Sequence, residues 1–236
     1  MQKLWTSLKP YLLATPQTLL FVCFLVLPLV AILIVSFWQF NGYSMTPAFT
    51  LDNYITIFTN KVYWDTYLNT VKFVFLVWFF ALLIAYPVAY FLAFYVESLR
   101  WQIILFVLCT IPFFTSNIIR MISWVPLLGR NGLVNQFLLT TGLIEQPLEN
   151  LLFSDFAIVL ALVHLYTLFM VVPVFNSLMR IDRNFITAAL DLGASRLQIL
   201  KEVIIPLSAP GIAIGSIFVV TLVMGEFLTV RWMGGG

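Results

Sequence analysis

Five long apolar segments dominate this sequence of 236 residues, and each is long enough to cross a lipid bilayer as a helix. A helix rises about 1.5 Å per residue, so about 20 residues cover the hydrocarbon core of roughly 30 Å. Only 9% of the residues are charged, whereas a soluble domain has about 25%. Inside lipid, only a helix or a closed barrel satisfies its own backbone. We therefore predict an all-α, polytopic transmembrane helical bundle with spans at residues 17–38, 70–95, 102–125, 154–176 and 211–230.

The distribution of Lys and Arg predicts the orientation of the bundle, because cytoplasmic segments of membrane proteins carry an excess of these residues. With the N-terminus inside, seven of them lie on the inner side and five on the outer side. The inner set is Lys3, Lys9, Arg100, Arg180, Arg183, Arg196 and Lys201, and the outer set is Lys61, Lys72, Arg120, Arg130 and Arg231. We expect a multi-pass protein of the cytoplasmic (inner) membrane, in contact with lipid, whose N-terminus is cytoplasmic.

Several classes of function are excluded by what the sequence lacks. The net charge is only +2, so nothing in it indicates nucleic-acid binding. His164 is the only histidine, which excludes metal sites and peptidases built on a histidine pair. No lysine follows a glycine, so the chain has no Walker A phosphate-binding loop and cannot be an ATPase. We predict a protein that is not an enzyme, binds no metal and holds no cofactor. For His164 we expect a helix-packing role through an interhelical hydrogen bond, and a role as a ligand is the alternative.

The most polar long segment, residues 182–206, lies between the fourth and fifth spans and predicts a helix-turn-helix elbow. Gly193 can adopt the left-handed conformation that ends a helix. Ser195 and Gln198 fit a capping box at the start of a second short helix, and we expect Pro206 to end that helix. The apolar face predicted for the second helix comprises Leu197, Leu200 and Ile204.

This elbow resembles the signature of ATP-binding-cassette importer permeases, which reads Glu-Ala-Ala, three residues, Gly-Ala, and Pro thirteen residues after the Gly. Ala188, Ala189, Gly193, Ala194 and Pro206 stand at the matching positions, and Thr187 replaces the leading Glu. The resemblance implies that this elbow, including Asp191, lies in a groove of a separate ATP-hydrolysing subunit and couples that subunit to the membrane helices. The alternative is an ordinary cytoplasmic loop, because short motifs also occur by chance.

Three further stretches, residues 86–90, 112–135 and 225–230, are similar to the spermidine/putrescine branch of this family. In the second stretch, Asn117, Arg120 and Trp124 follow the order typical of the third helix of that branch. Glu226 stands where the branch usually has Asp. Importers of iron, phosphonates and other small solutes share much of this pattern, so the resemblance leaves the solute open.

Arg120 and Glu226 also stand out on physical grounds, because a charge inside a span costs at least about 2.5 kcal/mol on insertion scales. One interpretation places Arg120 and Glu226 at the outer mouth of the translocation pathway, paired with each other. Asn117 and Trp124 would lie along the same pathway. For Arg120 the alternative is that its side chain extends to the outer headgroups. A secondary transporter is a different class of interpretation. Such proteins often carry inverted repeats and charges at the membrane midplane, and we see neither here.

The resemblance implies a complex of this permease with a second permease subunit, two ATP-binding subunits and an extracytoplasmic solute-binding protein. ATP would be used by the partner subunit alone. Permeases of this branch usually have six spans, whereas this sequence shows five before its last residues, Gly234-Gly235-Gly236. We therefore expect residues 1–236 to form a single transmembrane permease domain that lacks its final helix.

Overall fold

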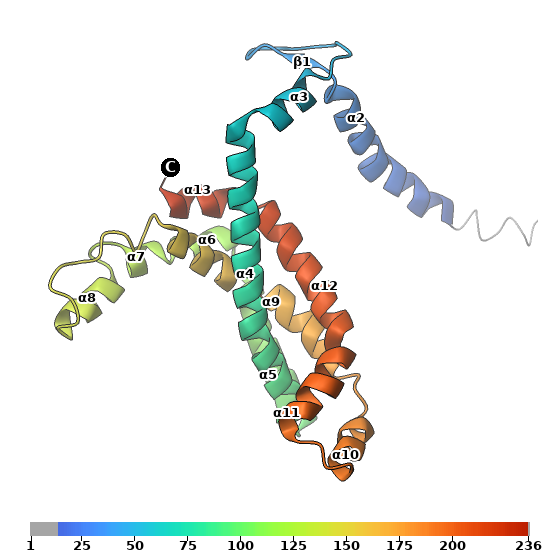
Figure 1. The fold of residues 1–236 in the computed structure, drawn as a ribbon, viewed down its shortest axis with the longest axis vertical. Coiled ribbons are helices and arrows are strands. Elements are labelled where there is room, and N and C mark those ends of the chain that lie inside the picture. Colours follow the sequence, from blue (N-terminus) through green and yellow to red (C-terminus); the bar gives the residue numbers. More distant parts are fainter. Residues whose placement is uncertain (1–13, 236) are drawn as a thin grey trace, which may run out of the picture. The chain divides into compact units, whose positions relative to one another are not determined.

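The computed structural model describes residues 14–235 (Figure 1). They belong to two compact units, with the boundary between Leu68 and Asn69. Within the described residues, four helices are long and apolar enough to cross a membrane. They are Ala14–Val35, Lys61–Phe94, Asp155–Leu178 and Arg196–Met224. A fifth crossing arises only if Leu99–Phe114 and Asn117–Thr140, which are bent by 91°, are taken together. Lys3 and Lys9, which contribute to the predicted orientation, lie outside the described residues.

The first unit consists of an apolar helix followed by a small polar connection. Its elements are the π-helical turn η1 (Val22–Val26), α2 (Leu27–Val35), the antiparallel strands β1 (Gln39–Phe40) and β2 (Met45–Thr46), and α3 (Asp52–Thr59). The side-chain amide of Asn53 donates hydrogen bonds of 2.8 Å to the carbonyls of Ser36 and Trp38. The hydroxyls of Ser36 and Tyr54 lie 2.7 Å apart. These bonds fix the start of α3 against the end of the apolar helix.

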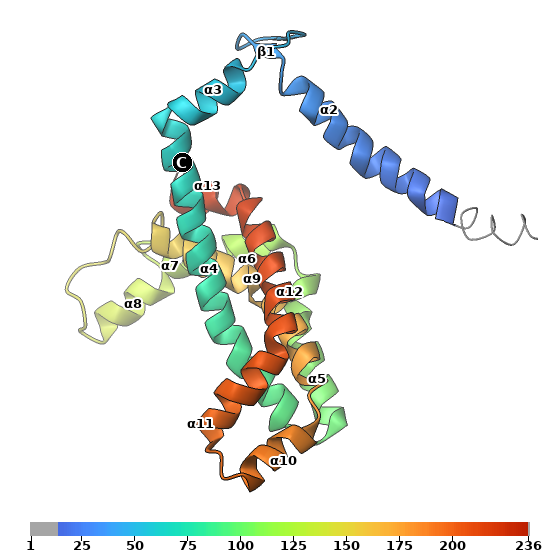
Figure 2. The same ribbon diagram turned by 45° about the vertical axis from the view of Figure 1, so that its right-hand side comes forward.

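The second unit contains the remaining helices, of which α4 begins before the unit boundary. In chain order they are α4 (Lys61–Phe94), α5 (Leu99–Thr110), the 3-10 helix η2 (Ile111–Phe114), α6 (Asn117–Ile122), α7 (Val125–Leu128), α8 (Leu133–Thr140), α9 (Asp155–Leu178), α10 (Arg183–Asp191), α11 (Arg196–Gln198), the π-helical turn η3 (Ile199–Ile204), α12 (Ile205–Met224) and α13 (Leu228–Gly234). Figure 2 shows α10 and α11 at one end of this unit and α13 at the other.

Helix α9 is the centre of the second unit, and α12 packs along it at unusually short range. A Cβ atom added to Gly211 would lie 2.4 Å from the Cβ of Ser177 and 2.5 Å from the carbonyl oxygen of Pro173. A Cβ atom on Gly215 would lie 2.6 Å from the sulfur of Met170. These two glycines, four residues apart, form the small-residue contact by which membrane helices approach closely.

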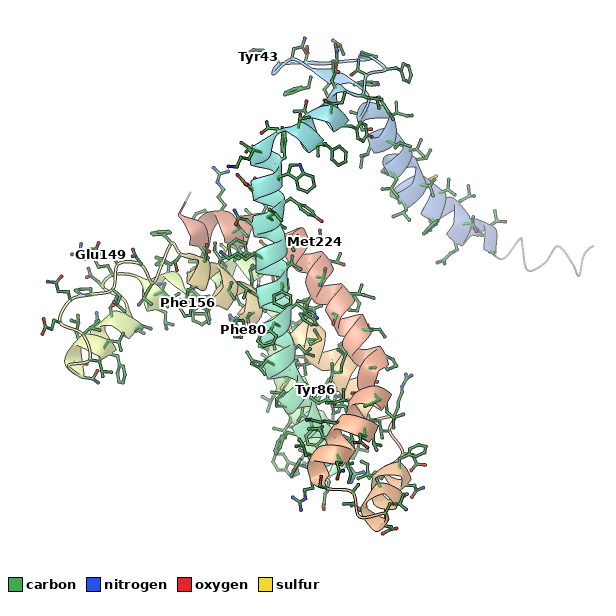
Figure 3. The ribbon with its side chains drawn as sticks, viewed as in Figure 1. Tyr43, Phe80, Tyr86, Glu149, Phe156 and Met224 are labelled. Atoms are coloured by element: carbon green, nitrogen blue, oxygen red, sulfur yellow. The ribbon has the colours of Figure 1, made fainter. Side chains whose placement is uncertain are left out.

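Helix α4 packs through small side chains at a spacing of four residues, which places them on one face of the helix. The fully buried positions are Val77, Ala81, Ala85 and Ala89. Two polar contacts join α4 to α12. The indole N–H of Trp78 donates to the hydroxyl of Ser216 at 2.7 Å, and the hydroxyls of Tyr86 and Ser208 lie 3.2 Å apart (Figure 3). Such bonds hold helices together where hydrophobic burial gives little preference for protein over lipid.

The predicted third span, residues 102–125, is not a continuous helix. Helix α5 and η2 end at Phe114, and the next residue, Thr115, is extended at φ −95° and ψ 139°. Pro112 lacks a backbone N–H and favours the tight turn at this position. Residues 99–114 as a helix span only about 24 Å at about 1.5 Å per residue, which is less than the hydrocarbon core. The chain then turns through 91° into α6.

The predicted fifth span, residues 211–230, is wrong at both ends. One helix runs without a break over Arg196–Met224, and Pro206 does not end the second arm of the elbow. The π-helical turn η3 precedes Pro206, and its i→i+5 pattern accommodates the missing N–H. This wider turn also buries Ile199 and Ile204, whereas Leu197 of the predicted apolar face is 59% exposed.

Candidate functional site

Helix α10, the first arm of the elbow, has a defined start and end. The carboxylate of Asp182 accepts a 2.9 Å hydrogen bond from the backbone N–H two residues later and caps the helix start. The N–H of Gly193 donates to the carbonyl of Leu190 at 2.9 Å, and the N–H of Ala194 donates to that of Ala189 at 3.0 Å. This Schellman motif requires the left-handed conformation, which Gly193 adopts at φ +81°. The conformation predicted for Gly193 is confirmed.

The second arm begins with the predicted capping box. The backbone N–H of Ser195 donates to the side-chain oxygen of Gln198 at 2.9 Å, and the N–H of Gln198 donates to the Ser195 hydroxyl at 3.4 Å. The Schellman motif and the capping box are adjacent in the sequence. Together their backbone and side-chain hydrogen bonds hold the corner between the two arms, whose residues are mostly exposed.

The residues predicted for coupling lie on the surface of this elbow. Thr187, Ala188, Asp191, Gly193 and Pro206 are exposed, and Ala189 and Ala194 are half-buried. Pro206 lies in the first turn of α12, beyond the corner itself.

Two large apolar side chains on the same elbow, Phe185 and Leu192, were not singled out by sequence reasoning. They are 57% and 88% exposed. Phe185, Ala188 and Ala189 lie on one face of α10, and Leu192 directly follows the last residue of this helix. The spacing of Phe185, Ala188 and Ala189 was a readable signal. The exposed elbow surface is therefore a small-residue corner flanked by two apolar side chains, which is a surface suited to docking into a protein groove.

The predicted pathway residues on the third segment gather beside α9. Asn117, Arg120 and Trp124 all lie in or next to α6. The indole N–H of Trp124 donates to Nδ1 of His164 at 3.1 Å, and the two rings meet edge to face with centroids 5.5 Å apart. The packing role predicted for His164, an interhelical hydrogen bond, is confirmed.

Arg120 is buried, with only 7% of its surface exposed. One terminal nitrogen, Nη2, donates to the side-chain oxygen of Asn117. The other two guanidinium nitrogens, Nε and Nη1, are buried without a hydrogen-bond partner. This burial contradicts the alternative in which the side chain extends to the outer headgroups, and it leaves two donors facing the interior of the unit.

Glu226 lies in the break between α12 and α13 rather than inside a span. One carboxylate oxygen accepts hydrogen bonds of 3.0 Å from the backbone N–H and the hydroxyl of Thr229, which caps the start of α13. The other oxygen accepts a hydrogen bond from the hydroxyl of Tyr166 on α9. Among the described residues Glu226 forms no ion pair with Arg120, so the predicted pairing is wrong. Glu226 is instead bonded to Tyr166, which lies 60 residues away in sequence.

Neither location offers groups for bond chemistry. Across residues 14–235, no cluster of three or more His, Cys, Asp or Glu side chains could hold a metal ion. The elbow presents exposed small and apolar side chains. At the opposite end of the unit, Arg120 and Tyr166 are buried, Trp124 and Glu226 are half-buried and Asn117 is exposed. Helices α9 and α12, which pack against each other, run between the elbow and these residues (Figure 1).

Comparison with known proteins identifies relatives along nearly the whole chain. No family model matches the sequence. The spermidine/putrescine transport system permease protein PotB of Salmonella typhimurium (strain SL1344) is 35% identical over 215 residues, covering 91% of this chain and 74% of the relative. PotB of Escherichia coli (strain K12) is 35% identical and covers 91% and 77%. PotB of Haemophilus influenzae is 31% identical, covering 90% of this chain and 73% of that protein.

A solved structure shares the fold. It is the crystal structure of a bacterial ABC transporter involved in the import of the acidic polysaccharide alginate. The match has a TM-score of 0.65 at 20% identity, and it covers 94% of this chain and 77% of that chain. The all-α permease fold and the family predicted from the elbow motif are thereby confirmed.

Permease subunits of this family bind no cofactor and leave ATP hydrolysis to a partner subunit. They are multi-pass inner-membrane proteins that work in a complex. This chain belongs to that family: it is the permease subunit of an ATP-binding-cassette importer.

Proposed function

We propose that this permease imports a polyamine of the spermidine and putrescine class. The observation that carries the proposal is 35% identity over 91% of the chain to permeases named for transport of these two compounds. Glu226 supports it, because a carboxylate beside the pathway favours a cationic solute. We place Asn117, Arg120 and Trp124 with Glu226 along the route of the solute.

The elbow couples this transport to ATP hydrolysis in the proposed mechanism. The docking surface comprises Thr187, Ala188, Ala189, Asp191, Gly193, Ala194 and Pro206, extended by Phe185 and Leu192. The exposure of all these residues except Ala189 and Ala194, which are half-buried, supports this assignment. Closure of two ATP-binding subunits would move the elbow, and the continuous helix from Arg196 would carry that movement toward Glu226.

The complete importer in this proposal contains a second permease subunit, two ATP-binding subunits and an extracytoplasmic solute-binding protein. In this proposal the N-terminus and the elbow both face the cytoplasm, an orientation that requires the bent pair Leu99–Phe114 and Asn117–Thr140 to form a fifth crossing. The larger number of Lys and Arg residues on the elbow side supports this orientation.

The test is uptake by the whole importer, reconstituted in vesicles with ATP on the side of the ATP-binding subunits and the solute-binding protein on the other side. Labelled spermidine should accumulate only with ATP present. Glu226→Gln should reduce uptake per molecule, whereas the exposed control Glu145→Gln should leave it unchanged. ATP-dependent accumulation of another solute, with no accumulation of spermidine or putrescine, would refute the polyamine assignment.

A second candidate solute class is a phosphorylated small molecule. The sn-glycerol-3-phosphate permease UgpA of Shigella flexneri is 28% identical and covers 85% of this chain and 68% of that protein. The two unpartnered, buried donors of Arg120 favour an anion. The same uptake assay with labelled glycerol 3-phosphate separates the two candidates.

A further inference from the structure

A cavity of about 370 Å³ lies between the C-terminal end of α4 and the two arms of the elbow. Its lining combines aromatic, apolar and basic side chains from these three elements. They are Tyr90, Phe94, Tyr95, Arg183, Ile186, Thr187, Leu190, Arg196, Ile199 and Ile204. Both arms of the elbow contribute lining residues, and Figure 2 shows the two arms, α10 and α11, at one end of the unit.

The charge in this cavity is purely positive. Arg183 and Arg196 line it, and no carboxylate does. Among the described residues neither arginine forms an ion pair. Arg183 donates one hydrogen bond of 3.3 Å to the carbonyl of Ala93, and a guanidinium has five N–H groups in all. Two cations in a partly apolar recess therefore have donors left for an anion.

Thr187 explains why the cavity lacks an acid. It lies four residues after Arg183 on the same face of α10, and its hydroxyl donates to the Arg183 carbonyl at 3.2 Å. A glutamate at this position, as in the elbow signature, would face Arg183 within reach of an ion pair. The threonine of this chain removes that intramolecular partner.

We propose that this cavity binds a phosphate-bearing anion, either the headgroup of an anionic phospholipid or soluble phosphate. Guanidinium groups match phosphate oxygens in geometry and charge. Tyr90 and Tyr95 line the same recess, and a tyrosine hydroxyl is a hydrogen-bond donor. Its apolar wall, including Phe94 and Leu190, suits the glycerol and first methylenes of a lipid. Basic pockets between membrane helices commonly hold anionic headgroups.

The test uses the whole importer complex purified in nanodiscs that contain phosphatidylcholine with or without phosphatidylglycerol. Native mass spectrometry then measures which lipid the complex retains. The unchanged complex should retain phosphatidylglycerol with about tenfold preference, the factor that corresponds to roughly 1.4 kcal/mol. Thr187→Glu should abolish the preference by pairing with Arg183. Thr187→Gln, which has the shape of glutamate without its charge, should keep the preference.

Arg196→Gln provides a second route that leaves α10 unchanged, and it should also reduce the preference. Arg100→Gln is the matched control, because Arg100 is exposed and does not line the cavity. Added inorganic phosphate should compete with phosphatidylglycerol. If phosphate binds in pure phosphatidylcholine discs in the same Thr187-dependent way and no phosphatidylglycerol is enriched, soluble phosphate is the ligand.

Two results would overturn the proposal. One is that complexes carrying Thr187→Glu, Thr187→Gln or Arg196→Gln retain phosphatidylglycerol and bind phosphate as strongly as the unchanged complex does. The other is binding of either anion only after the ATP-binding subunits have been removed, which would assign the cavity to the protein interface. Neither result depends on the transported solute, so failure here is distinct from failure of the polyamine assignment.

Discussion

Replacing Gly211 by Ala should destabilise this permease, although alanine is the better helix former. Helix propensity alone favours the substitution by about 1 kcal/mol. The added Cβ, however, would lie 2.5 Å from the carbonyl oxygen of Pro173 and 2.4 Å from the Cβ of Ser177. Neither group can rotate away, because one is backbone and the other is the first side-chain atom.

The magnitude follows from these contacts. Overpacking a well-packed contact costs typically about 1–3 kcal/mol, and fixed neighbours place Gly211 at the upper end of that range. Subtracting the propensity gain of about 1 kcal/mol leaves a net loss of roughly 2 kcal/mol. For a chain of this size such a loss lowers the melting temperature by about 4–8 °C. Gly215→Ala should lose less, since the sulfur of Met170 lies at the end of a flexible side chain.

The assay is thermal unfolding of the purified complex in detergent, followed by size-exclusion chromatography, for three Gly→Ala variants. Gly225→Ala is the control, because its added Cβ would make only ordinary contacts of 3.7 and 3.8 Å. The expected order of melting temperature is Gly225→Ala highest, then Gly215→Ala, then Gly211→Ala. A Gly211→Ala variant as stable as the Gly225→Ala variant would refute the close approach of α9 and α12.

Four substitutions at three positions test the elbow and the cluster around Arg120 and Glu226. Gly193→Ala should lower the free energy of unfolding by about 1–2 kcal/mol, because a φ of +81° disfavours a Cβ, whereas Gly193→Asn should retain more stability. If ATPase activity stays equally coupled to transport in both variants, the geometry of the corner has no role in coupling. Glu226→Gln should lower transport more than membrane abundance, as quantified by uptake per immunoblotted molecule; a parallel fall in both would reduce Glu226 to a helix cap. Arg120→Met should raise thermal stability by about 1–2 kcal/mol, because it removes buried donors without partners, while transport falls; unchanged transport would exclude Arg120 from the pathway.

Local features of the chain were predictable from sequence because short-range chemistry determines them. The left-handed Gly193 and the capping box of Ser195 and Gln198 depend on residues at most five positions apart. The fourth span was predicted as residues 154–176 and occurs as Asp155–Leu178. A uniformly apolar segment with a serine at its start contains all the information needed to place such a helix.

Other features depend on contacts that the sequence does not display. The polar run Thr115-Ser116-Asn117 marks the bend after Phe114, but it is short and lies between long apolar stretches, so the hydropathy of the whole segment still predicts one span. Proline rules predicted a helix end at Pro206, yet a π-helical turn before it restores continuity. The partner of Glu226 is Tyr166, and only the packing of α12 and α13 on α9 brings the two together. By contrast, the Gly211–Gly215 contact was readable and was overlooked.

The unbroken helix Arg196–Met224 links the two surfaces mechanically. Its 29 residues extend roughly 43 Å at about 1.5 Å per residue, from the elbow corner to the break that contains Glu226. Had Pro206 ended the second arm, as predicted, a flexible joint would separate the elbow from the membrane helices and absorb any displacement. The helix instead continues, and it is held against α9 at Gly211 and Gly215. A rotation imposed at the elbow must therefore either move the α12–α13 break relative to Tyr166 or shear the glycine contact. Along the described part of this helix, the π-helical turn, Pro206 and Pro210 interrupt the regular backbone hydrogen bonds, so we predict that the strength of coupling depends on this region.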